Sequence, residues 1–221
     1  DVRPLFSGTA EPNSIVEIFL DGSSIGTTET RASGTWYFGT NSDLSDGTYS
    51  ITAKATDSAG NTSEVSSALS LTIDSTAPSA PNTPDLASST DTGSSTSDDI
   101  TADTTPTFTG TAEADSTVEI FSDGSSLGTT TTDSDGNWSF TSGTLDAGTY
   151  SITAIATDTA GNTSYESDAL NITISENNGK ARFSISGETE GGNTISISQD
   201  LDDPDGNGTL GYSWQISSDL K

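Results

Sequence analysis

The chain has 221 residues, of which 33 are acidic and six are basic, and its formal net charge is -27. A charge of this sign disfavours nucleic acid and anionic membrane surfaces as partners and favours cations. The sequence contains no Cys and no His, which excludes disulfides, thiolate chemistry, the usual zinc sites and Ser-His or Cys-His catalytic pairs.

An internal repeat organises most of the sequence. The segment from Pro4 to Ile73 returns from Pro106 to Ile174, at an offset of about 102 residues that slips by one near Leu44. This period exceeds the roughly 20–50 residues of a solenoid repeat and matches one small β domain. We therefore expect two copies of one module in series. Nothing in the first copy corresponds to residues 79–102, so we expect it to lack its first strand and to expose the neighbouring strand edge.

The elements are clearest in and before the second copy. Residues 75–84 hold three prolines and predict a stiff, extended linker. Residues 85–103 are rich in Asp, Ser and Thr and predict a first edge strand interrupted by a long polar loop. Alternating apolar residues then predict strands at 107–112, 117–121, 126–132, around Trp138 and Phe140, at 149–157 and at 169–174, with a tight hairpin at Asp123-Gly124.

Short strands separated by turn signals, without a helical pattern or an apolar run long enough to span a bilayer, predict an all-β fold without membrane insertion. We expect tandem immunoglobulin-like antiparallel β-sandwich domains joined by a short Pro-rich linker. Their expected limits are 1–74 for a repeat lacking its first strand, 75–84 for the linker, 85–175 for a complete repeat, and 178–221 for a partial third β module. An aromatic platform for carbohydrate stacking is the alternative use of Trp36, Tyr49, Trp138 and Tyr150, but their period of two assigns them to the core.

Several motifs of the second copy are familiar as a set. It reads Gly-Thr-Ala-Glu at 110–113, Val-Glu-Ile-Phe at 118–121, Gly-Asn-Trp-Ser-Phe at 136–140 and Ala-Thr-Asp-Thr-Ala-Gly-Asn at 156–162. Residues 1–175 thereby resemble the bacterial immunoglobulin-like repeats of large calcium-dependent biofilm-associated and RTX-type adhesins. The resemblance implies an extender segment at the bacterial cell surface, with neighbouring repeats of the same polypeptide as partners. It also implies that calcium stiffens the domain junctions and that another region binds the adhesion ligand.

Acidic loops suggest where calcium would bind. Threading the strands up and down places loops 113–116, 133–137 and 158–162 at the end of the second copy that faces the linker. Calcium takes six to eight oxygen ligands, which carboxylates and backbone carbonyls supply. We therefore predict a structural Ca²⁺ site at the junction, with ligands drawn from Asp74, Glu113, Asp133, Asp135 and Asp158.

A plain structural alternative exists for the same residues. Asp133 and Asp135 fit a hairpin turn, and Asp158 fits a loop cap. The first copy has Arg31 and Ser33 at the positions of Asp133 and Asp135, so it lacks the full acidic set.

A second candidate calcium site lies in the long polar loop before residue 104. Four carboxylates within 13 residues repel each other unless a cation or water screens them, and solvation alone is the alternative. They are Asp91, Asp98, Asp99 and Asp103. Residues 203–207 have calcium-loop spacing, but Pro204 and the lack of a distal Glu favour a plain turn.

The favoured function is structural, and the alternative is a glycan- or protein-binding β-sandwich module. An enzyme is not expected, because two acids in one turn do not flank a cleft. The chain begins at Asp1 without Met, and we expect it to be an excerpt of a longer polypeptide.

Overall fold

The computed structural model describes residues 2–93, 95–175, 182–186 and 196–201. The chain divides into two compact units, with the main boundary between Ala77 and Pro78. We call residues 2–77 domain one and residues 78–175 domain two. Every regular element in the described part of the chain is a strand, and no helix there is long and apolar enough to cross a membrane.

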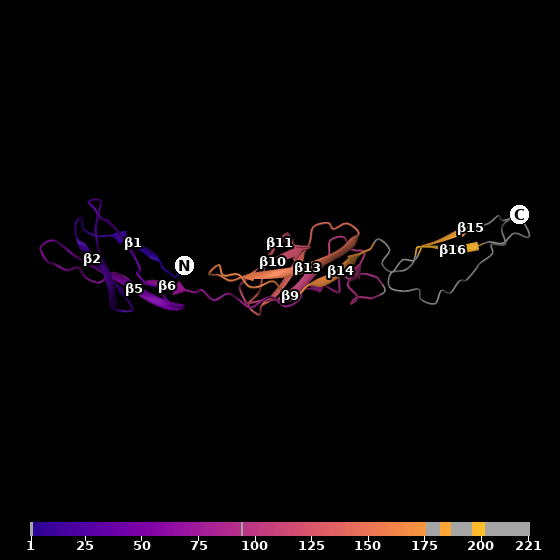
Figure 1. The fold of residues 1–221 in the computed structure, drawn as a ribbon, viewed down its shortest axis with the longest axis horizontal. Helices are drawn as coiled ribbons and strands as arrows, with labels where there is room; N and C mark the ends of the chain where they lie inside the picture. The colour runs from indigo at the N-terminus through magenta and orange to yellow at the C-terminus, as the bar shows by residue number, and fades with distance from the viewer. Residues whose placement is uncertain (1, 94, 176–181, 187–195, 202–221) are drawn as a thin grey trace, which may run out of the picture. The chain divides into compact units, whose positions relative to one another are not determined.

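Domain two is a sandwich of two sheets (Figure 1). Its strands are β7 (Asp85–Leu86), β8 (Ile100–Thr101), β9 (Thr107–Thr111), β10 (Thr117–Ser122), β11 (Ser125–Thr131), β12 (Asn137–Thr141), β13 (Gly148–Thr157) and β14 (Leu170–Ile174). One sheet has the order β12-β9-β7, and the other has the order β11-β10-β13-β14-β8. The predicted first strand is therefore split between the sheets: β7 pairs antiparallel with β9, whereas β8 pairs parallel with β14.

The core of domain two follows the alternation in the sequence. Val118 and Ile120, two residues apart on β10, are both fully buried. On the neighbouring strand β13, the alternate residues Ile152, Ala154 and Ala156 are also fully buried. They share one face because every second side chain of a strand points to the same side. The predicted hairpin is confirmed, since β10 and β11 are joined by Asp123-Gly124 with both residues at positive φ.

In each domain a tryptophan lies across a glycine of the neighbouring strand. Trp138 of β12 faces Gly110 of β9, and a Cβ atom on Gly110 would lie 2.5 Å from Cζ2 of the indole. Trp36 and Gly8 repeat the arrangement in domain one, at 2.6 Å. Glycine is required at both places because the ring occupies the space of any side chain.

Domain one has the same arrangement with fewer strands. Its strands are β1 (Leu5–Thr9), β2 (Ile15–Leu20), β3 (Ser23–Glu29), β4 (Thr35–Gly39), β5 (Gly47–Thr56) and β6 (Leu69–Ile73). One sheet is β1-β4 and the other is β3-β2-β5-β6. Counterparts of β7 and β8 do not occur in the described part of domain one, so the outer edges of β1 and β6 pair with no strand there.

Two further strands follow domain two. β15 (Arg182–Ser186) and β16 (Ser196–Leu201) pair antiparallel. Both strands lie within the range 178–221 predicted for a partial third β module. The predicted turn at 203–207 lies outside the described residues.

Candidate functional site

Three loops meet at one end of domain two. In the strand register, Asn137 pairs with Thr111 and Thr157 pairs with Thr117, which places loops 113–116, 133–137 and 158–162 at the same end. The Thr132 hydroxyl ties two of these loops together, since it donates to the Glu113 carbonyl at 2.7 Å and accepts the Ser116 N–H at 2.8 Å. The three loops predicted to supply calcium ligands therefore do lie at one end of domain two.

Asp133 acts within its own turn. Its carboxylate accepts the backbone N–H groups of Asp135 at 2.9 Å and Asn137 at 2.8 Å. The backbone and side-chain amides of Asn137 hold the pKa of Asp133 below its usual range. This is the geometry of the turn alternative, and the carboxylate is already engaged in it.

The other residues predicted to bind calcium at the junction do not gather around one point in the described structure. Glu113 contributes its backbone carbonyl to the Thr132 contact, Asp135 is exposed in the turn, and Asp158 follows the end of β13. Asp74 belongs to domain one, where its carboxylate accepts the Thr76 N–H at 3.0 Å. In the described residues, no three acidic side chains come close enough together to hold a metal ion. The junction site therefore stays a prediction.

The long polar loop contains a buried carboxylate. Asp91 is only 2% exposed, and its Oδ2 accepts a long 3.4 Å hydrogen bond from the N–H of Asp99. Its Oδ1 is buried and has no hydrogen-bond partner among the described residues. Burial raises the pKa of Asp91, and the neighbouring carboxylates of Asp98 and Asp99 raise it further. Such an oxygen is costly to bury without a partner.

The other members of this second set differ from Asp91. Burial raises the pKa of Asp99, with Asp85 and Asp98 adding repulsion. Asp98 accepts the N–H of Ile100 at 3.2 Å. The carboxylate of Asp103 is engaged in a turn with the N–H and hydroxyl of Thr105, at 2.8 and 3.0 Å.

Without divalent metal, the free energy of unfolding of domain two should rise as the pH falls from neutral toward 3.8. The raised pKa of Asp91 means that the folded domain binds this proton more tightly than the unfolded chain does, so acidification favours the fold. Asp91→Asn should remove part of this gain. Urea midpoints in EDTA at pH 7 and pH 5 measure it. Asp135→Asn removes the same charge from an exposed turn and is the matched control. An equal gain in wild type and Asp91→Asn would contradict the prediction.

Sequence reasoning missed Asp46, which fastens the segment after β6. Its carboxylate accepts the Ser75 N–H at 2.9 Å, the Ser75 hydroxyl at 2.7 Å and the Thr76 hydroxyl at 2.6 Å. The Thr76 hydroxyl is the first cause of a lowered pKa at Asp46, followed by Ser75. No signal in the repeat could have found it, because Ala147 occupies the corresponding position of the second copy.

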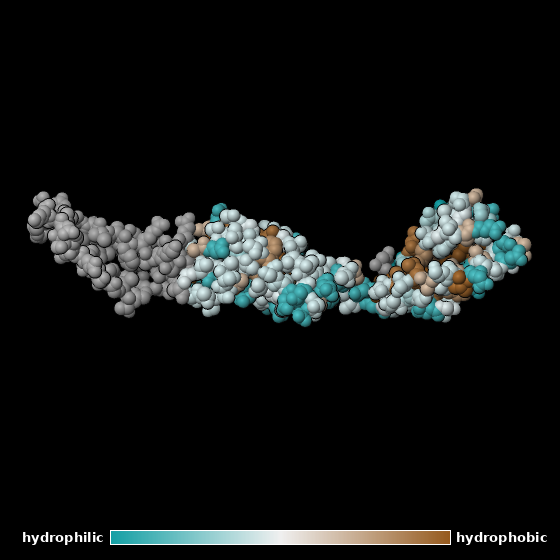
Figure 2. Space-filling view, turned by 180° about the vertical axis from the view of Figure 1, so that it is seen from behind, coloured by the Kyte–Doolittle hydropathy of each residue, from teal (hydrophilic) through white to brown (hydrophobic). Residues whose placement is uncertain are grey.

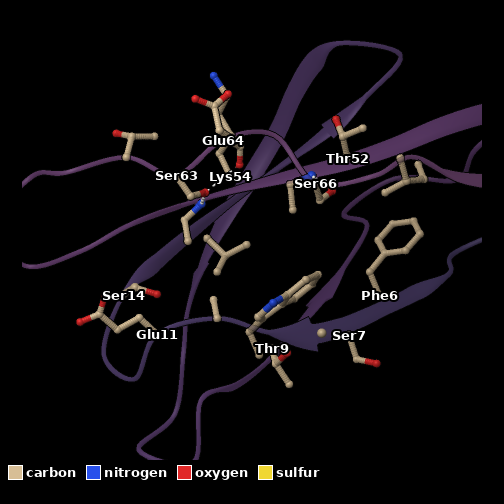
Figure 3. A pocket seen from close by; sticks show the side chains of 18 of the residues that line it. Phe6, Ser7, Thr9, Glu11, Ser14, Thr52, Lys54, Ser63, Glu64 and Ser66 are labelled. Atoms are coloured by element: carbon tan, nitrogen blue, oxygen red, sulfur yellow. Dashed lines mark hydrogen bonds between the residues drawn. The ribbon is translucent and has the colours of Figure 1, made fainter.

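A groove opens between the two sheets of domain one. Its volume is about 870 Å³, and residues of β1, β5 and segment 61–67 line it. Figure 3 shows Phe6, Ser7 and Thr9 of β1 on one side and Thr52 and Lys54 of β5 on the other. Figure 2 shows brown, apolar residues at the surface of domain one, on the right of that view.

Two features common to both domains define the class of the protein. The first is a pair of sheets with one buried tryptophan between them, antiparallel throughout except for the β8–β14 pairing of domain two. The second is a tyrosine whose hydroxyl donates to a carbonyl four residues upstream, Tyr49 to Ser45 at 2.8 Å and Tyr150 to Asp146 at 2.9 Å. Together they define an immunoglobulin-like β-sandwich, present twice in tandem.

The chain belongs to the bacterial Ig-like domain family, whose model matches residues 1–75 and 77–176. Both matched stretches are Ig-like modules, and the predicted all-β tandem fold is confirmed. No curated protein matches the chain.

Solved structures with similar folds include the fibronectin(III)-like modules of Clostridium thermocellum CbhA. They are 19% identical with a TM-score of 0.44, over 77% of this chain and 85% of that chain. The BSP domain of a biofilm associated protein is 21% identical with a TM-score of 0.31, over 76% of this chain and 27% of that chain.

Proposed function

We propose that this chain is a structural extender segment of a secreted bacterial cell-surface adhesin, and that calcium stiffens its domain junctions. The observation that carries the proposal is the tandem of two modules with one fold and one buried core pattern each. The longest strands, β5 and β13, have ten residues each, so each module contributes a length of about 33 Å.

The start of the connector supports this role within domain one. Asp46 accepts three hydrogen bonds from Ser75 and Thr76, which holds the first residues after β6 against the domain. Three prolines follow within residues 75–84 and restrict the backbone further. A connector restrained in this way suits a segment that must keep its length.

Calcium is the cofactor that the acidic loops favour. The unpartnered Oδ1 of Asp91 is a hard oxygen donor, and a bound cation would offset the repulsion from Asp98 and Asp99. At the predicted junction, Asp74, Glu113, Asp135 and Asp158 would supply further oxygens, whereas Asp133 is already engaged in its turn. Calcium would act structurally at both places.

We expect calcium to lengthen the protein in solution. An ion shared by Asp74 and the loops of domain two would restrain the linker, so small-angle scattering should give a larger maximum dimension in millimolar calcium than in EDTA. Asp74→Ala should reduce this response, and Glu29→Ala, which removes an exposed acid at the end of β3 in domain one, is the control.

Thermal melts of the same samples separate stiffening from stability. A site filled at 100 times its dissociation constant adds about 2.7 kcal/mol to the free energy of unfolding. Equal midpoints and equal dimensions in calcium and EDTA would reject the calcium part of the proposal. A compact, collapsed particle in both buffers would reject the extender role itself.

A further inference from the structure

The two copies of the module differ at the groove of domain one, which is open. In domain two the corresponding space is filled by residues 82–87 of the same chain. Asn82 donates its N–H to the Thr111 carbonyl at 3.0 Å, and Ala87 donates its N–H to the Thr107 carbonyl at 2.9 Å. Between them, Asp85 pairs with Thr109. This short segment therefore runs antiparallel along the whole outer edge of β9.

Apolar side chains of the same segment complete the core of domain two. Leu86 is 3% exposed and packs in one cluster with Phe108, Trp138 and Ile152. Pro81 and Pro84 are also buried. The segment thus presents a Pro-x-x-Pro-x-Leu pattern to the sandwich.

Domain one offers the same surface without this cover. The repeat aligns Thr107, Thr109 and Thr111 with Leu5, Ser7 and Thr9, whose side chains are exposed. Leu5 is 69% exposed and Leu69 is 56% exposed.

Residues of β5 at the base of the groove are likewise less buried than the corresponding residues of β13 in domain two. Ala53 and Ala55 line the groove and are half-buried, whereas Ala154 and Ala156 at the same positions of domain two are fully buried.

We propose that the groove of domain one is an acceptor for an extended strand with the pattern Pro-x-x-Pro-x-Leu, supplied by the connector segment of another bacterial Ig-like repeat and paired antiparallel with β1. The occupant is defined by the second copy, where this pattern fills the corresponding space. Phe6, Trp36 and Ile51 repeat Phe108, Trp138 and Ile152, so the groove presents the same core residues to the leucine.

The chemistry of such binding is strand addition to an open sheet edge. Backbone hydrogen bonds to β1 supply affinity, and the leucine and proline side chains supply specificity. A proline-containing strand is already extended when free, which lowers the ordering cost of binding. The backbone groups that would pair are those of Leu5, Ser7 and Thr9, at the positions that pair in domain two.

The test is a titration of the full chain with a synthetic peptide of residues 79–91. We expect saturable binding of one peptide per chain, because residues 82–87 already fill the groove of domain two. Amide hydrogen exchange should slow at Ser7, whose counterpart Thr109 pairs with Asp85. The protein itself is unchanged, so a folding defect cannot imitate loss of binding.

Two peptide variants make the test specific. Asp85→Pro removes the N–H that faces Ser7, and Leu86→Asp removes the apolar side chain; each should weaken binding about tenfold or more. Absence of saturable binding, two peptides per chain, or equal binding of all three peptides would overturn the proposal. Self-association of the chain that protects Ser7 without peptide would assign the groove to a second copy and would also overturn it.

Discussion

Phe108→Ala is expected to lower the free energy of unfolding of domain two by about 3–5 kcal/mol. Phe108 is fully buried, pairs with Leu86 of β7 and with Phe140 of β12, and belongs to the core cluster of its domain. Removing its ring leaves a cavity enclosed by strands on both sides, which the surrounding residues cannot fill. Urea unfolding followed by calorimetry and by tryptophan fluorescence measures the loss.

The matched control is Phe6→Ala in domain one. Phe6 occupies the same place in the repeat but lines the open groove, so part of its surroundings is already accessible to water. We expect a smaller loss there than in domain two. Equal losses in the two domains would show that the groove does not weaken the packing around Phe6.

Gly110→Ala is the second substitution with a large expected effect, about 1–3 kcal/mol or more of destabilisation in domain two. The added Cβ would lie 2.5 Å from Cζ2 of Trp138, inside the van der Waals distance, so the indole would have to leave its position in the core. The near-ultraviolet circular dichroism of the tryptophan should change together with the unfolding midpoint.

Gly143→Ala controls for the change from glycine to alanine. Nothing lies within 4 Å of a Cβ atom at Gly143, and its backbone is not in the left-handed region. This variant should retain the wild-type midpoint. A Gly110→Ala protein with an unchanged midpoint and an unchanged tryptophan signal would contradict the packing described for this strand pair.

Sequence periodicity predicted the elements in which alternate residues are buried. The strand predicted at 117–121 from its alternating residues is present as β10, and its alternate residues Val118 and Ile120 are both fully buried. Trp138 was assigned to the core rather than to a surface platform, and it is 4% exposed. These predictions succeed because a half-buried strand must alternate, whatever its partners are.

The first strand of domain two could not be predicted in detail from sequence periodicity. β7 and β8 have two residues each, which is too short for any period, and they join different sheets. Their pairing is decided by β9 and β14, which lie far along the chain from them. A first edge strand with a long polar interruption could be predicted, but its division between two sheets could not.

The candidate site residues depend still more on contacts between distant residues. Asp91 stands in an Asp-Thr-Gly sequence typical of an exposed turn, yet the fold buries it next to Asp99, eight residues later. Asp46 binds Ser75 and Thr76 from 29 and 30 residues away. Asp133 is the opposite case: its contacts are all within four residues, and the turn alternative could be derived from the sequence.

The parallel pairing of β8 with β14 has a mechanical consequence. Thr173 donates its N–H to the carbonyl of Asp99 and Ser175 donates its N–H to the carbonyl of Thr101, at 2.9 and 2.8 Å, so the last strand of domain two lies beside β8, the strand that follows the long polar loop. Tension between β8 and the C-terminal end of the domain would slide these parallel segments past each other and load their hydrogen bonds together. Domain one has no such clamp in its described residues, since β6 is the edge of its sheet. Under a steady pull, we therefore expect domain one to unfold at a lower force than domain two.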